Sequence, residues 1–195
     1  MTTPRQLPEN VLPPRLRVQF WAWQSLVITV WVLLLIWIGN ETSVWLKVGW
    51  GLVSAVTLGW QAWRLYRNLP ENRLEIESPI KTTLGIANWL SLLRGSLLAY
   101  LAGFILIPAP TGGLEWLPAA LYLTAALLDY LDGAAARLMH STTRLGEVLD
   151  MELDGFGILV ASIIVISNGQ APVLFIMVGA ARYLFVWCIK RHEKK

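Results

Sequence analysis

The chain has 195 residues, of which 55% are hydrophobic and 15% charged, and its formal net charge is +3. Soluble globular domains carry about 25% charged residues, so this composition excludes an ordinary soluble domain and indicates an integral membrane protein. The small, unevenly spread positive charge predicts membrane orientation rather than nucleic-acid binding.

Apolar runs of bilayer length follow one another along the chain, since about 17 to 25 mostly apolar residues cross a bilayer as a helix. They cover residues 19–39, 44–63, 90–109, 115–136, 148–168 and 171–189. Turn and breaker residues such as Gly39-Asn40 and Asn168-Gly169 separate them. The first run is too long for the apolar part of a signal peptide, so we expect it to be a true span. The sequence predicts an all-α, polytopic bundle of about six transmembrane helices.

Basic residues alternate between the connections of these runs. Lys and Arg are frequent in the N-terminal segment, the 64–94 connection, the 137–146 turn and the C-terminal tail, whereas the intervening loops hold almost none. The positive-inside rule therefore predicts a multi-pass protein with both termini in the cytoplasm, in the inner or plasma membrane if the source is bacterial. Residues 64–88 are either a plain linker or contain a short helix on the membrane surface.

Acidic residues gather where the fourth run ends and the fifth begins. Helical spacing predicts two facing stripes, the first made of Asp129, Asp132, Gly133, Ala136 and Arg137 and the second of Gly146, Asp150 and Asp154. Counting from the outer end of each run places Asp129 and Asp154 about 20 Å deep at 1.5 Å per residue. Both stripes then begin in the cytoplasmic half of a hydrocarbon core about 30 Å thick.

Carboxylates at this depth repel one another and are costly to ionise unless cations lie between them. Donor sets of oxygen alone favour Mg²⁺, Mn²⁺ or Ca²⁺ over zinc, and two divalent ions balance four aspartates and can bridge a diphosphate. Gly133 and Gly146 leave room for a bulky ligand, and Arg137 offers a fork that matches phosphate. The alternative is that the acids cap helix ends or face water, with the glycines allowing close helix packing.

The spacing of these residues also carries a resemblance. The pattern Asp129-x2-Asp132-Gly133-x2-Ala136-Arg137-x8-Gly146-x3-Asp150-x3-Asp154 resembles in full the signature of the class I CDP-alcohol phosphotransferase family. Upstream, "ANWLSLLR" at residues 87–94 is similar to the "PNxLTxxR" that opens the first core helix of that family, with Ala87 for Pro and Ser91 for Thr. The resemblance covers about residues 82–188.

The resemblance implies a membrane enzyme of phospholipid synthesis that moves a phosphoalcohol group from a CDP-alcohol, such as CDP-diacylglycerol, to an acceptor alcohol and releases CMP. It implies that Asp129, Asp132, Asp150 and Asp154 hold two divalent ions, Mg²⁺ or Mn²⁺, and that Asp154 is the general base. The pocket for cytidine and diphosphate would be lined by Gly133, Ala136, Arg137 and Gly146. Asn88 is a further substrate-binding candidate, and Arg182 is a candidate partner of an anionic acceptor. Membrane lipid is an expected partner, a homodimer is left open, and the active site would face the cytoplasm.

One departure from the family pattern concerns the number of helices. The family core has six, whereas four are predicted from residue 82 to residue 195 here, after a 1–81 extension with two helices and a cytoplasmic linker. We expect the last two core helices to be missing because the chain is truncated. Two alternatives are that the first two helices replace them in space, or that the protein binds CDP-alcohol without turnover.

Two other functions use the same residues. A divalent-cation transporter would also need intramembrane acids, although neither an internal repeat nor a broken helix is evident. A catalytically defective relative that acts as a subunit would explain the missing helices.

Overall fold

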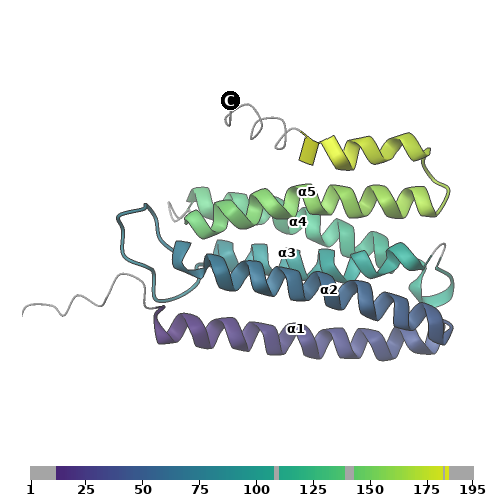
Figure 1. Ribbon diagram of the computed structural model, residues 1–195, viewed down its shortest axis with the longest axis horizontal. Helices are drawn as coiled ribbons and strands as arrows, with labels where there is room; N and C mark the ends of the chain where they lie inside the picture. The colour runs from purple at the N-terminus through teal and green to yellow at the C-terminus, as the bar shows by residue number, and fades with distance from the viewer. Residues whose placement is uncertain (1–11, 108–109, 139–142, 182, 185–195) are drawn as a thin grey trace, which may run out of the picture.

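The computed structural model describes residues 12–107, 110–138, 143–181 and 183–184, with the side chains of 135–138 excepted (Figure 1). All regular elements in these ranges are helical, and the long ones run side by side along one axis. The bundle comprises α1 (Pro14–Glu41), α2 (Val44–Asn68), η1 (Leu69–Glu71), α3 (Ile86–Gly103), η2 (Phe104–Leu106), η3 (Gly112–Leu114), α4 (Leu117–Leu138), α5 (Arg144–Ser167) and η4 (Val173–Phe175). Residues 176–181 and 183–184 are helical as well. The all-α expectation is confirmed.

Local chemistry explains where these helices begin and end. Pro14 begins α1, where the missing proline N–H is no loss. Thr143 precedes α5, and its hydroxyl oxygen accepts a 3.1 Å hydrogen bond from the backbone N–H of Gly146. Beyond the end of α5, Gly169 has φ of +70°, a conformation that stops a helix and that glycine adopts without strain.

Helix α3 is the centre of the bundle. In its most apolar window 67% of the residues are buried, against 11% in α1, so α1 lies at the periphery. Helix α2 lies between them, and α4 and α5 cover the other side of α3 (Figure 1). Trp50 of α2 is fully buried and meets Phe104 edge to face, with ring centroids 6.3 Å apart. Helix α2 therefore packs directly on the helix that opens the predicted core, and α1 packs mainly on α2.

Two helical stretches, Pro14–Glu41 and Ile86–Leu106, are long and apolar enough to cross a bilayer by length and composition. The aspartates in α4 and the acids in α5 lower the hydropathy of those helices, which is what a polar site inside a membrane helix would do. The number of spans and the orientation of the termini stay predictions.

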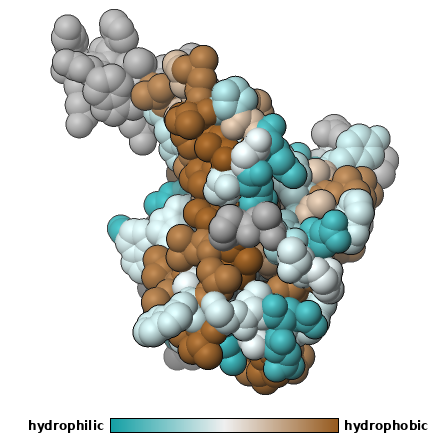
Figure 2. All heavy atoms as spheres, turned by 90° about the vertical axis from the view of Figure 1, so that its right-hand side faces the viewer, coloured by the Kyte–Doolittle hydropathy of each residue, from teal (hydrophilic) through white to brown (hydrophobic). Residues whose placement is uncertain are grey.

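The start of α1, the α2–α3 connection, the end of α4 and the start of α5 lie at one end of the bundle (left in Figure 1). The described parts of the N-terminal segment, the 64–94 connection and the 137–146 turn therefore lie at the same end. Residues 72–85 of the α2–α3 connection contain no helix, so the linker alternative holds for these residues. Seen from the opposite end, a band of hydrophobic side chains runs through the middle of the view, with hydrophilic patches beside it (Figure 2).

Candidate active site

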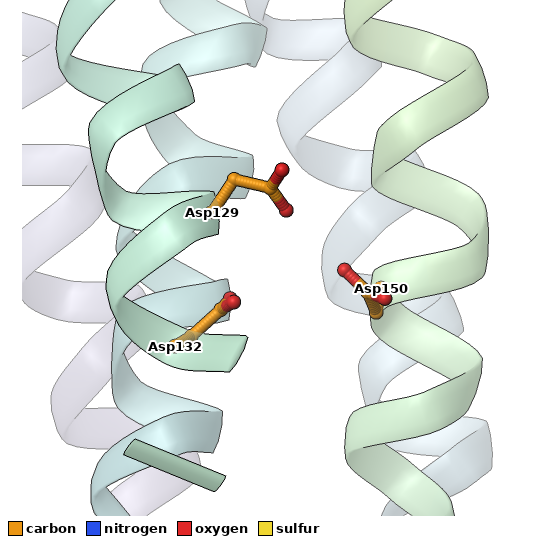
Figure 3. Close-up of side chains that lie close together, drawn as sticks. All are labelled: Asp129, Asp132 and Asp150. Carbon is orange, nitrogen blue, oxygen red and sulfur yellow. The ribbon is translucent and has the colours of Figure 1, made fainter. Parts of the chain in front are cut away.

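Carboxylates from α4 and α5 meet in the space between the two helices. Asp129 and Asp132 come from α4 and Asp150 from α5, and one oxygen of each lies within 4.8 Å of the others (Figure 3). Asp132 is 6% exposed. The side chains of Asp129 and Asp150 are 45% and 52% exposed, so solvent or a ligand can reach them. The predicted facing stripes bring these three aspartates together.

Arg94 of α3 lies among the acids. It is 5% exposed and forms ion pairs with Asp129, Asp150 and Asp154, the Nη1–Oδ1 distance to Asp150 being 3.0 Å. One turn earlier, the hydroxyl of Ser91 donates a 2.9 Å hydrogen bond to Oδ2 of Asp132. Helix α3 therefore contacts all four aspartates, although they belong to α4 and α5.

The position of Arg94 corrects an expectation from the sequence. The charge pattern of the sequence places Arg94 in the basic 64–94 connection, but Arg94 is buried inside α3. A signal was present, because Arg94 is the lone charged residue in the otherwise apolar run from 86 to 107, and charges inside such runs are functional candidates. It is also the last residue of the "ANWLSLLR" stretch.

The donor set fits a divalent metal ion. Four carboxylates and one guanidinium leave three negative charges when all are ionised. Close carboxylate oxygens with no sulfur or imidazole donor among them suit Mg²⁺ or Mn²⁺. Asp154 is joined to the other acids through Arg94 and lies outside the close group of three. Its place in a four-aspartate metal set stays a prediction.

A second polar group links α3 and α5 at the end nearer the α2–α3 connection. Asn88 Nδ2 donates to Oδ1 of Asn72 at 3.1 Å, and the hydroxyl of Thr143 donates to Oδ1 of Asn88 at 3.2 Å. A Cβ on Gly146 would lie 2.9 Å from the same Asn88 oxygen, so a larger residue here would displace the Asn88 amide. Asn88 and Gly146, both predicted to bind substrate, thus lie together in a packed contact between helices.

The remaining predicted residues are placed less completely. Gly133 is half-buried in α4. Ala136 and Arg137 belong to the end of α4, but their side chains lie outside the described part of the structure, as does Arg182. Their substrate-binding roles stay predictions.

A cavity of about 410 Å³ opens beside the acids between α3, α4 and α5. Arg94, Asp129 and Asp154 form its charged part, and the rest is lined by Leu98, Tyr122, Ala125, Ala126, Leu153, Gly157 and Ile158. Tyr122 also lines a second cavity of about 480 Å³ further along α4 and α5. The site is therefore charged at one end and mainly apolar beyond it, which suits an amphiphilic ligand.

The helical fold and the carboxylate site define an all-α protein with a candidate divalent-metal centre between α4 and α5, next to the apolar helix α3. The family model described as CDP-alcohol phosphatidyltransferase matches residues 84–193, more than half of the chain, and the protein belongs to this family. The family is membrane-embedded and transfers a phosphoalcohol from a CDP-alcohol to an acceptor alcohol, typically with divalent metals. No curated protein and no solved structure matches the chain.

Proposed function

We propose that the protein transfers a phosphatidyl group from CDP-diacylglycerol to a small acceptor alcohol and releases CMP, using a two-metal site. The observation that carries this proposal is the meeting of Asp129, Asp132 and Asp150 from two helices, at one end of a cavity with mainly apolar walls. A nucleotide diphosphate linked to acyl chains has the same division into a charged and an apolar part.

Each aspartate has a proposed role. Asp129, Asp132 and Asp150, together with Asp154, would hold the two ions, Mg²⁺ or Mn²⁺. When bound, such ions neutralise charge on the diphosphate and on the attacking and leaving oxygens. Arg94 keeps the carboxylates of α4 and α5 in register, since its guanidinium pairs with both helices. Ser91 orients Asp132 through its hydrogen bond.

The chemical step requires a base and an exposed acceptor. Asp154 lines the cavity with a side chain that is 39% exposed, so an acceptor hydroxyl can reach it. The hydroxyl proton passes to the Asp154 carboxylate while the hydroxyl oxygen bonds to the phosphorus that carries the diacylglycerol group. The bond from that phosphorus to the bridging oxygen breaks, and CMP leaves with the bond electrons. Positioning and charge neutralisation supply most of the rate in such transfers.

The testing experiment measures CMP release by the purified chain from CDP-diacylglycerol with Mg²⁺ or Mn²⁺ across a panel of acceptor alcohols. We expect release with one acceptor, and none when Asp150→Asn replaces the wild type or a chelator removes the metal. Full activity of Asp150→Asn would contradict the metal assignment. Metal flux into vesicles without CMP release would favour a cation transporter. Metal-dependent binding of CDP-alcohol without release would indicate a binding subunit.

A further inference from the structure

Helix α5 carries acids on two opposite faces. Glu152 lies two positions from both Asp150 and Asp154, so at 100° per residue its side chain projects about 160° away from each of theirs. The aspartates face α4 and the cavity, whereas Glu152 faces α2. A residue that pairs with Glu152 therefore restrains α5 on the face opposite Asp150 and Asp154.

Arg64 of α2 holds Glu152. Arg64 Nε donates a 3.1 Å hydrogen bond to Oε2 of Glu152, and Arg64 Nη2 pairs with Oε1. Two parallel contacts of this kind fix the orientation of the carboxylate as well as its distance. Both side chains are partly buried, so the pair is shielded from bulk water more than a surface pair would be.

The same face of α2 also holds α3 next to Arg94. Gln61, one turn before Arg64, donates a 2.9 Å hydrogen bond from Nε2 to the carbonyl of Gly95. A Cβ on Gly95 would lie 3.1 Å from a methyl of Leu153 on α5, so α3 and α5 approach closely there. One turn of α2 thus contacts α3, through Gln61, and α5, through Arg64.

Helix α5 makes little direct contact with either α4 or α2, whereas α3 packs extensively on both α4 and α5. Helix α3 therefore sets the position of α5 relative to α4, and the Arg64–Glu152 pair is a polar tie between α5 and α2 that can fix the rotation of α5. We propose that Arg64, outside the family-matched residues, is a positioning residue that fixes the rotation of α5 through Glu152 and so aligns Asp150 and Asp154 with Asp129 and Asp132. This inference rests on the proposed function, because the alignment matters for metal binding and transfer.

The test uses charge reversal on the full-length protein in detergent. Arg64→Glu, Glu152→Arg and the double swap are compared for Mn²⁺ affinity, by electron paramagnetic resonance of free Mn²⁺, and for CMP release. We expect each single variant to lose about 10-fold or more in Mn²⁺ affinity, as for other partners that orient metal ligands, and the swap to recover most of that loss. Arg67→Glu is the matched control: Arg67 is exposed on the same helix, with its guanidinium 5.0 Å from the centroid of the Trp63 ring.

Three outcomes overturn the proposal: wild-type Mn²⁺ affinity in both folded single variants, an equal loss in Arg67→Glu, or a folded swap without recovery. If a reversal variant does not fold, Arg64→Gln and Glu152→Gln replace it, and unchanged Mn²⁺ affinity in both overturns the proposal equally.

Asp150→Asn separates this inference from the proposed function. Loss of Mn²⁺ binding in Asp150→Asn with none in the Arg64 and Glu152 variants rejects the positioning role alone. Unchanged Mn²⁺ binding and activity in Asp150→Asn reject the metal site itself.

Discussion

Helices α3 and α5 meet at two levels that differ in chemistry. At the first, Arg94 pairs with Asp150 and Asp154, whose side chains remain substantially exposed. At the second, Asn88 and Thr143 are buried and joined by neutral hydrogen bonds. The same two helices are thus connected by accessible charge at one level and by inaccessible amide and hydroxyl groups at the other.

This difference in exposure indicates that the acidic level serves ligand binding and the amide level serves helix packing. Exposed carboxylates can exchange one cationic partner for another, so the first level can bind ligands. Buried polar groups must be satisfied inside the protein, and Asn72, Asn88 and Thr143 satisfy one another. We therefore expect substitutions at the acidic level to change activity and those at the amide level to change stability.

The largest effect is expected for Asp132→Asn. Asparagine keeps the shape of the side chain and can still accept the hydrogen bond from Ser91, but it removes a negative charge from the metal site. Because the metal would then stabilise the transition state by several kcal/mol less, we expect kcat/KM to fall at least about 100-fold with folding unchanged. Kinetics and thermal unfolding of the same preparation check this. Wild-type kcat/KM would place the metal elsewhere.

A smaller loss is expected for Arg94→Lys. Lysine keeps the charge but cannot pair in a planar fork with acids on both α4 and α5. Losing one charge-assisted hydrogen bond, about 1.5 to 3 kcal/mol, predicts at least a 10-fold lower transfer rate. Arg17→Lys on the exposed face of α1 serves as the control. Equal rates for the two variants would mean that charge alone suffices at Arg94.

The smallest effect on activity is expected for Asn72→Ala. The Asn72 amide is fully buried and bonds to the carbonyls of Lys81 and Thr83 as well as to Asn88. The alanine variant leaves these buried partners without their hydrogen bonds. We therefore expect the free energy of unfolding to fall by about 1 to 3 kcal/mol, with the transfer rate per folded molecule unchanged.

The midpoint of thermal unfolding, followed by circular dichroism, and the KM for CDP-alcohol decide the outcome, with exposed Asn40→Ala as control. A several-fold rise in KM without a change in the midpoint would place Asn88 in the ligand pocket.

Much of the site was predictable from the sequence because it depends on helical periodicity. Asp129 and Asp132 share one face of α4, and Asp150 and Asp154 share one face of α5; the short connection between the two helices keeps these groups at a similar level. Arg94 was missed because an arginine near the end of an apolar run is also what the positive-inside rule expects of a loop.

The long-range side-chain partners around the site could not be predicted from the sequence. Arg64 and Glu152 are 88 positions apart, and Asn72 and Thr143 reach Asn88 from different elements. No local period relates residues this distant, because tertiary packing alone decides which helix faces align. The metal set and the number of spans remain predictions for the same reason: each depends on groups beyond the two helices that carry the signature.

The Arg64–Glu152 pair also has a consequence for engineering. A chimera that transplants only residues 84–193 into another membrane protein would carry Glu152 without its arginine, and leaving a partly buried carboxylate unpaired is destabilising. It would also leave the Gly95 carbonyl without Gln61. The portable unit of this protein is therefore longer than its family-matched segment and begins at or before Gln61.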